Sequence, residues 1–289
     1  MAVVATWTDR RTGHEQRVDA AIGDHRERRR TGETHPVEDF LFTYYSLRPA
    51  QLRRWHPGWG GVLDGSEAEA YLGLRGYQRG PGGVGVSTAY ATSQRPLLIA
   101  LQRLLRATST RPAQFGCFGL HEWAMVYGEE QTGVRHSAWP LRLGREGTDA
   151  VVERHRIACT HFDAYRFFTP PAQPLNVLSP SHDNRADFEQ PGCLHAGMDL
   201  YKHAGRLLPL VSSELVMDCF DLAREIRVLD MRASPYDFRA LGYEPVAIET
   251  SQGKQTYADG QRAFTVRAAP LRQRLLDACD ELLADIDTP

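Results

Sequence analysis

The chain has 289 residues, of which 42% are hydrophobic and 24% are charged. This length and composition are typical of a globular protein with one large core, so we expect one domain over residues 32–289 behind a charged arm, residues 1–31. The formal net charge of −2 gives no overall attraction to nucleic acid, and phosphate contacts would need a local arginine cluster. No apolar run approaches the roughly 20 residues that cross a bilayer, so we expect no membrane partner.

The cysteines are five in number and scattered through the chain. A disulfide framework needs paired cysteines at regular spacing, and the N-terminus lacks the apolar core of a signal peptide. We therefore expect reduced thiols and a cytoplasmic location.

Helices are predicted over most of the N-terminal half. Residues 15–31 are typical of a charged, solvated helix that is rich in arginine. A second helix is predicted to open at His35 and Pro36, because proline is tolerated in a first helical turn and apolar residues then recur at helical spacing. The glycine-rich residues 73–85 predict a loop, and Ser93 is expected to cap a leucine-striped helix that follows it.

The C-terminal half is predicted to contain a strand and then more helices. Residues 157–167 alternate in polarity, which predicts a strand. Residues 194–208 and 213–231 predict two helices, and their short connection makes them an antiparallel hairpin in which Ser212 caps the second helix. A last helix is expected over about 270–286. The fold class is therefore mainly α with a small β-sheet (α+β), with an antiparallel helical hairpin at about 194–231.

Histidines and carboxylates recur on the two hairpin helices. His195, Asp199 and His203 lie four residues apart on the first helix and share one face. Acidic residues recur at similar spacing on the second helix: Glu214, Asp218, Asp221 and Glu225. With a pivot near residue 210, His203 is expected level with Asp218, and His195 level with Glu225. This arrangement favours metal ligation or acid–base catalysis, and the alternative is a solvated face neutralised by arginines.

A metal site with two histidines and one carboxylate is a second possibility. His161 and Asp163 would lie on one side of the predicted strand, and His195 would complete a non-haem iron set. The candidate metal ligands are His161, Asp163, His195, Asp199 and His203, and the expected ion is iron or zinc. Lys202 lies in the same helix and could form a Schiff base, with a surface lysine as the alternative.

Aromatic residues offer a surface for a flat ligand. The candidates for stacking on an alkylated base are Tyr44, Tyr45, Trp55, Trp123 and Tyr127. Residues 118–127 combine such aromatics with the acid–base pair His121 and Glu122. An aromatic core cluster is the alternative interpretation.

Four runs of residues carry a resemblance to a known family: 35–46, 118–127, 159–171 and 190–201. They resemble a bacterial family usually labelled 3-methyladenine DNA glycosylase, and the resemblance spans most of the chain. It implies release of 3-methyladenine from alkylated duplex DNA without a cofactor. The implied chemistry is base extrusion, stacking on aromatics, and a carboxylate that orients water. The candidate catalytic residues are His121, Glu122, Asp163 and Asp199.

Two enzymatic functions therefore stay open. The first is a DNA repair N-glycosylase, a hydrolase of base excision. The second is a metal-dependent oxidoreductase or hydrolase that acts on a small molecule through histidines, carboxylates and bound iron or zinc. A module that only binds a planar ligand is a third possibility, which would leave the histidines and carboxylates without a role.

Overall fold

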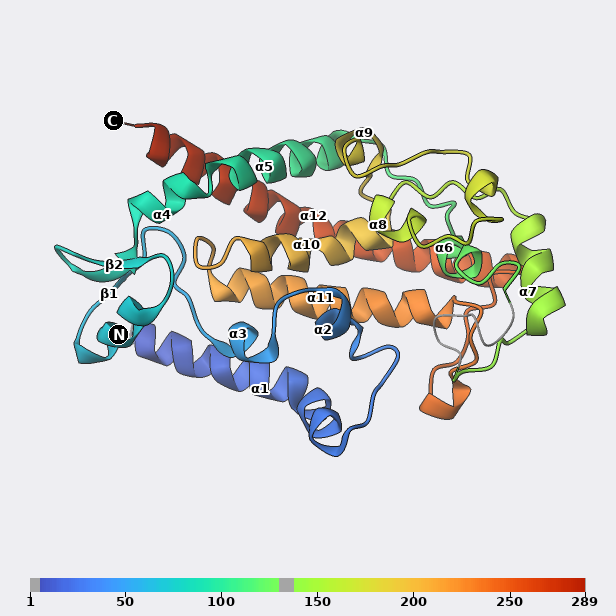
Figure 1. Cartoon of the computed structure of the whole chain (residues 1–289), viewed down its shortest axis with the longest axis horizontal. Helices are drawn as coiled ribbons and strands as arrows, with labels where there is room; N and C mark the ends of the chain where they lie inside the picture. Colours follow the sequence, from blue (N-terminus) through green and yellow to red (C-terminus); the bar gives the residue numbers. More distant parts are fainter. Residues whose placement is uncertain (1–5, 130–137, 289) are drawn as a thin grey trace.

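The computed structural model describes residues 6–129 and 138–288 and is mainly helical with one small antiparallel sheet (Figure 1). The expected fold class is confirmed. None of the described helices is both long enough and apolar enough to cross a membrane.

A helical hairpin occupies the centre of the molecule (Figure 1). Its helices are α10 (Leu194–Arg206) and α11 (Ser213–Arg232), and they pack closely on one another. Ser212 caps α11 by accepting a hydrogen bond from the backbone N–H of Leu215, as predicted. Apolar side chains of both helices lie in the main core, which fixes the antiparallel pair in place.

Three long helices pack around this hairpin. The helix α12 (Ser251–Asp287) contacts both α10 and α11, and α5 (Arg95–Thr110) packs on α12 through its leucine stripe. On the other side, α1 (Trp7–Thr31) contacts α11 and α3 (Pro49–Arg53). The short helix α2 (Phe40–Tyr44) also lies against α11.

The sheet lies at one end of the long axis, and several of the short helices lie in the opposite half (Figure 1). The strands β1 (Val62–Leu63), β2 (Tyr77–Gly80) and β3 (Gly83–Val86) pair in the order β1-β3-β2. Beside them lie a 3-10 helix (Ser66–Gly73) and α4 (Thr88–Ser93). The opposite half holds α6 (Leu120–Ala124), α7 (Gly144–Glu153), α8 (Phe162–Tyr165), α9 (Arg185–Phe188), and 3-10 turns at Gln173–Leu175 and Arg239–Leu241.

Five local expectations were wrong. The second helix begins at Phe40 and not at His35 or Pro36, because residues 36–39 form turns. Residues 157–167 form no strand: Ile157 makes an isolated bridge to Asn176, and α8 follows. Residues 73–85 include the β2–β3 hairpin. The last helix begins at Ser251, because Pro270 lies inside it and does not open it. Gln94, and not Ser93, is the N-cap of α5.

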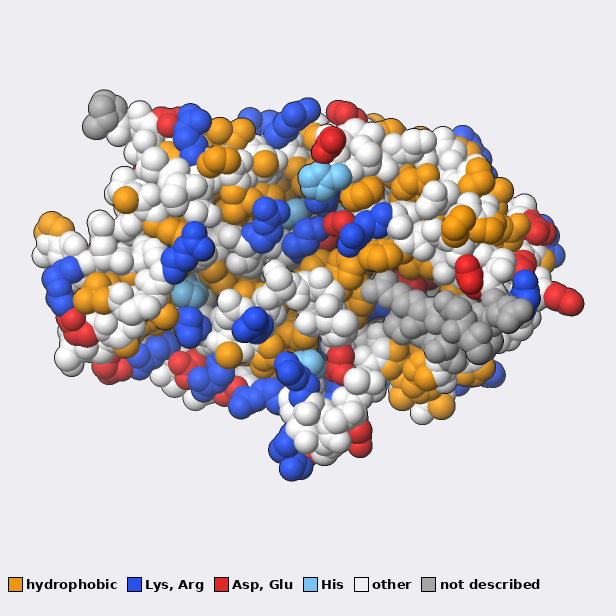
Figure 2. All heavy atoms as spheres, in the orientation of Figure 1, with side chains coloured by type: hydrophobic (Ala, Val, Ile, Leu, Met, Phe, Trp, Pro, Cys, Tyr) orange, Lys and Arg blue, Asp and Glu red, His pale blue; other side chains and the backbone are white. Residues whose placement is uncertain are grey.

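The arginines of α1 lie among acidic side chains. Arg10 binds Glu214, and Arg17 binds both Asp218 and Asp221. Further along the helix, Arg26, Arg28 and Arg30 also pair with carboxylates. Figure 2 shows red side chains among the blue ones along its lower edge, where α1 lies. The arm is therefore tied to the helical body by ion pairs.

Candidate functional site

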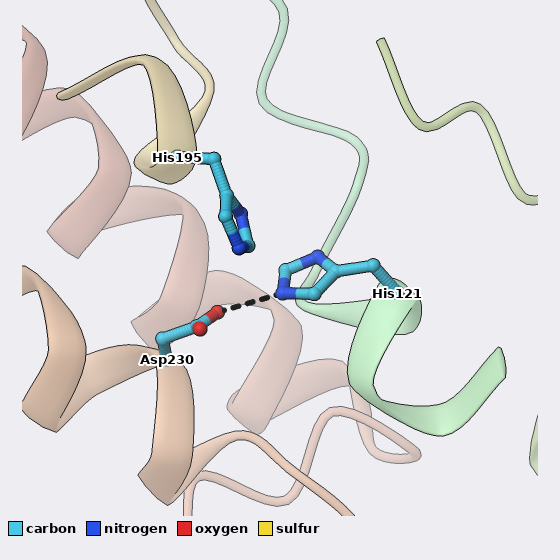
Figure 3. A group of neighbouring side chains, drawn as sticks. All are labelled: His121, His195 and Asp230. Carbon is cyan, nitrogen blue, oxygen red and sulfur yellow. Dashed lines mark ion pairs between the residues drawn. The ribbon is translucent and has the colours of Figure 1, made fainter. Parts of the chain in front are cut away.

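Three buried side chains from three helices converge at one point (Figure 3). His121 comes from α6, His195 from the first turn of α10, and Asp230 from the end of α11. One ligand atom from each residue lies within 4.8 Å of the other two. An ion at about 2.1 Å from each atom would hold the three atoms roughly 3 to 4 Å apart. Small rotations of the side chains would bring the three atoms to that spacing.

The hairpin brings two of these residues together. Because α10 and α11 are antiparallel, the start of α10 lies beside the end of α11, and His195 meets Asp230 there. Both side chains project into the interface with α6. The pair is therefore a direct consequence of the hairpin topology.

A glycine sets the position of the third residue. Gly119 precedes α6 with a φ of 71°, a left-handed conformation that side chains disfavour. A Cβ at Gly119 would lie 3.3 Å from the ring of Tyr257. The close approach of this backbone to α12 places His121 against Asp230.

Burial leaves the donor atoms of the cluster poorly satisfied. Nε2 of His121 lies 3.0 Å from Oδ1 of Asp230, but the two atoms are not aligned as a hydrogen bond, and neither has a hydrogen-bond partner among residues 6–129 and 138–288. Buried polar atoms without a hydrogen-bond partner are costly, and a bound water or ion is one way in which a protein satisfies them.

The charges of the three side chains change one another's pKa. Burial alone would lower the pKa of His121, but the Asp230 carboxylate outweighs it, so the pKa is raised. Burial and then the positive charge of His121 hold the pKa of His195 well below its usual value. Burial opposes ionisation of Asp230, but His121 and Arg227 keep the pKa of Asp230 low. Ionised Asp230 and neutral His195 are in the forms that bind a cation, whereas a metal ion would have to displace the proton that the raised pKa favours on His121.

Arg227 holds Asp230 from behind. Its Nη1 donates to Oδ2 of Asp230 at 3.1 Å and to Oε1 of Glu122 at 2.9 Å. The guanidinium also lies 3.8 Å from the ring centroid of Phe40. All three charged side chains of this group are buried. Arg227 therefore orients the carboxylate so that its other oxygen faces the histidines.

A cavity of about 340 Å³ opens beside the two histidines. Its wall is formed by side chains of α6, α10 and α12, by the loops that precede α6 and α10, and by the segment between α7 and α8. Residues from these segments line it: Gln114, Gly116, Cys117, Phe118, Leu120, His121, His155, Arg156, Ala158, Cys159, Thr160, Gln190, Cys193, Leu194, His195 and Tyr257. The three cysteines of this wall are free thiols. Burial raises the pKa of Cys159 to about 12, so its thiol is neutral.

A second buried network lies next to the cluster and is centred on Asp199. His161 is fully buried, with Nε2 at 3.2 Å from Oδ2 of Asp199 and its ring 5.2 Å from that of His195. Lys202 and Arg185 also bind Oδ2 of Asp199, and Tyr45 donates to its Oδ1. Asp199 is thus saturated by donors, which leaves little capacity for a metal ion.

The structure separates the residues expected to form one metal site. His195 is in the cluster, but His161 and Asp199 belong to the neighbouring network, and Asp163 is bound by Lys202 at 2.7 Å. His203 is buried two turns further along α10, about 12 Å from His195 in helical rise. Two histidines at that distance do not share an ion.

The acidic stripe of α11 does not face the histidines of α10. Its four members bind arginines of α1 and α12: Glu214 to Arg10, Asp218 to Arg17 and Arg274, Asp221 to Arg17, and Glu225 to Arg267. The expected contacts of His195 with Glu225 and of His203 with Asp218 are not found among the described residues, since both acids bind arginines. Asp230 is the acid that reaches His195, and it lies five residues beyond Glu225, about 140° further around the helix.

The five aromatic residues expected to stack on a base do not meet in one pocket. None of them lines the cavity. Trp55 and Trp123 are buried and donate to Glu214 and to the carbonyl of Ala233. The hydroxyls of the tyrosines bind elsewhere: Tyr44 the carbonyl of Asp163, Tyr45 Asp199, and Tyr127 Glu153.

Two further residues differ from the first interpretation. Asp230 was missed, although an acid four residues after Ile226 continues the apolar stripe of α11 and therefore signals a buried carboxylate. Lys202 is mostly buried, and although burial opposes its charge, Asp199 raises the pKa. A raised pKa disfavours the Schiff-base role, which needs a neutral amine.

No protein-family model matches this chain, and no curated protein or solved structure is significantly similar to it. The resemblance to the glycosylase family therefore stays a prediction, and the geometry of the site carries the functional argument.

Proposed function

We propose that the protein is a metal-dependent enzyme that acts on a small molecule, with His121, His195 and Asp230 as the metal ligands. One observation carries this proposal: two buried imidazoles and a buried carboxylate from three helices converge beside a cavity. Two histidines and one carboxylate are the protein ligands of many non-haem iron and zinc enzymes.

The surroundings of the cluster support the same conclusion. Arg227, which is itself bound by Glu122, donates to the Asp230 oxygen that does not pair with His121. Ligands oriented by outer hydrogen bonds are usual at metal sites, because they lower the cost of bringing the donors together. The free thiols at the cavity fit the cytoplasmic location that we also propose.

Three protein ligands leave coordination positions for other molecules. In this arrangement the cavity gives water or a substrate access to those positions. A bound ion would polarise a substrate oxygen or lower the pKa of a bound water. Iron at the site would favour an oxidoreductase, whereas zinc would favour a hydrolase.

The glycosylase function is a second proposal, supported by the resemblance. It requires phosphate contacts, yet the arginines of α1 that would make them are largely paired with carboxylates. It also requires aromatic residues around a base, and Phe118 and Tyr257 are the aromatic residues of the cavity wall. To bind DNA phosphates, the arginines of α1 would have to break these ion pairs with carboxylates.

Removal of bound metal by a chelator distinguishes the metal-dependent function from the glycosylase function. The purified protein is dialysed against a chelator, reloaded with Fe(II) or Zn(II) under anaerobic conditions, and followed by thermal unfolding. An ion that binds only the folded state raises the melting temperature, so we expect reloading to raise it in the wild type and not in His195→Ala. An unchanged melting temperature with both ions contradicts a metal site.

The same samples are tested for release of 3-methyladenine from alkylated duplex DNA. Base release that persists after chelation would support the glycosylase and contradict the metal-dependent function. The control variant is His203→Gln, which alters a buried histidine of the same helix outside the cluster. It should respond to reloading as the wild type does.

A further inference from the structure

The cavity wall carries one fixed positive charge and no acidic side chain. Its described lining residues include one guanidinium, that of Arg156, but no aspartate or glutamate. Asp230 does not line the cavity and is already paired with His121 and Arg227. In a chain with a net charge of −2, a cavity wall without carboxylates favours an anionic guest.

Arg156 has a free guanidinium. It is exposed, it lines the cavity, and no ion pair, hydrogen bond or ring contact engages it within the described part of the chain. Many arginines of this protein, such as Arg185 and Arg227, are paired with acids, whereas the guanidinium of Arg156 is available to a guest in the cavity. Its planar donors suit a carboxylate, which can accept two parallel hydrogen bonds.

Buried polar atoms on the same wall also lack partners. Tyr257 is fully buried, and its hydroxyl makes no hydrogen bond to oxygen or nitrogen in residues 6–129 and 138–288, although the thiol of Cys117 lies beside it. Nδ1 of His155 lies 2.6 Å from the carbonyl of Val151 and donates to it, while Nε2 is buried without a partner. Each of these groups can donate to an anion or accept from a polar guest.

The rest of the wall is apolar. Phe118, Leu120, Leu194 and Ala158 contribute hydrophobic surface, and the free cysteines Cys159 and Cys193 also line the wall as small, weakly polar side chains. A volume of about 340 Å³ is at the small end of the range for ligand pockets. The guest is therefore small and carries little polarity apart from its acid group.

We propose that the substrate is a small organic anion with an apolar body, whose acid group pairs with Arg156 and whose body lies against Phe118 and Leu194. This inference rests on the proposed function in one respect: the cavity is the substrate site because it adjoins the candidate metal ligands. The recognition of the anion itself depends on Arg156 and Tyr257 and does not require a bound ion.

Benzoate is a suitable probe, because it combines a carboxylate with a small apolar ring. Binding to the full-length protein is measured by calorimetry for the wild type, Arg156→Gln and Tyr257→Phe. We expect saturable binding that weakens about tenfold or more in Arg156→Gln and several-fold in Tyr257→Phe. Benzamide, the neutral isostere, should bind more weakly than benzoate and should be insensitive to Arg156→Gln.

Arg154→Gln is the matched control. Arg154 is an exposed arginine two residues away that donates to the carbonyl of Ala150 and does not line the cavity. It should bind benzoate as the wild type does. Equal losses in Arg154→Gln and Arg156→Gln, equal binding of benzoate and benzamide, or no benzoate binding would overturn the proposal. Inorganic phosphate should bind at least tenfold more weakly than benzoate, and tighter phosphate binding would contradict the apolar part of the proposal.

The titration is repeated after chelation to separate the two proposals. Arg156-dependent benzoate binding by protein that holds no metal supports the anionic substrate, even where metal analysis rules out the metal-dependent function. Metal binding without Arg156-dependent benzoate binding overturns this inference and leaves the proposed function standing.

Discussion

Nε2 of His121 lies 3.0 Å from Oδ1 of Asp230, across the junction of α6 and α11, and the two atoms are not aligned as a hydrogen bond. The two side chains form a buried ion pair, and each offers an atom that could bind the same ion. The position of His195 beside both residues completes the set. The site therefore depends on the relative placement of three helices.

Replacement of Arg227 should weaken both the fold and the site. Arg227→Gln leaves the carboxylates of Glu122 and Asp230 buried without their positive partner. Breaking a buried ion pair in this way costs about 3 to 5 kcal/mol of unfolding free energy. Urea unfolding at pH 7 measures that loss, and metal titration should show an affinity reduced roughly 10- to 100-fold.

Arg224→Gln is the control for this substitution. Arg224 lies one turn earlier on α11, is only partly buried, and stacks over Phe220. A surface change of this kind alters stability by about 0.5 kcal/mol or less. Similar losses in the two variants would contradict the role given to Arg227.

Replacement of Gly119 should damage the site more than its cost in stability explains. Gly119→Ala places a Cβ 3.3 Å from the Tyr257 ring and forces a left-handed backbone on alanine, at a cost of about 1 to 2 kcal/mol. Because α6 begins after this residue, we expect His121 to shift and metal occupancy to fall. Urea unfolding and metal analysis measure the two effects.

Gly242→Ala is the control that introduces backbone strain without displacing α6. Gly242 has a φ of 80°, but a Cβ at this position would meet nothing within 4 Å, so the strain is similar and the crowding is absent. It should lose comparable stability and keep its metal. Full metal occupancy in Gly119→Ala would show that His121 does not depend on this turn.

Asp199 should make the protein sensitive to acid. Burial opposes its ionisation, but Lys202 and His161 hold the pKa of Asp199 well below its usual value. A depressed pKa contributes stability that is fully present above the unfolded value of about 3.9 and is lost as the pH falls below it. Asp199→Asn should therefore be less stable at pH 7 and should lose less stability between pH 5 and pH 3 than the wild type.

Urea unfolding at pH 7, pH 5 and pH 3 measures this difference. Asp183→Asn serves as the control, because Asp183 is exposed and contacts His182 at the surface. Its pH dependence should match that of the wild type. An Asp199→Asn variant that loses as much stability in acid as the wild type would refute the assignment.

The cavity thiols should react slowly. Burial raises the pKa of Cys159 to about 12 and that of Cys193 well above its usual value. Because the thiolate is the nucleophile, each unit of pKa reduces the reactive fraction about tenfold below the pKa. Alkylation by iodoacetamide at pH 8, followed by peptide mass spectrometry, should be more than 100-fold slower in the folded protein than in urea. Equal rates would contradict buried, neutral thiols.

The hairpin was the part of the fold that the sequence predicted best. Apolar stripes and the Ser212 cap predicted helices over 194–208 and 213–231, and the structure has Leu194–Arg206 and Ser213–Arg232. The strand at 157–167 failed because its alternation reflects burial in a loop and in α8, where no neighbouring strand is available. Pro270 was misplaced because a proline at a helix start is the usual interpretation, whereas α12 continues through it.

The candidate site was predictable in part. His121 and His195 were named from their positions near acids and aromatics, but the face of α11 that meets them was not. When residues are counted from a pivot near residue 210, Glu225 is predicted to lie opposite His195. The apolar stripe, which decides which face of α11 is buried, instead continues through Ile226 to Asp230. Charge pattern alone favoured the partly or fully exposed acids of α11, because they are more numerous than its single buried acid, Asp230.

Elemental analysis of the purified protein tests the central claim most directly. The wild type and His203→Gln should hold near-stoichiometric iron or zinc, while His121→Ala, His195→Ala and Asp230→Asn should each lose it. Circular dichroism confirms that each variant is folded. Metal-free wild type that also fails to take up either ion, or variants that keep their metal, would contradict the assignment of His121, His195 and Asp230 as a metal site.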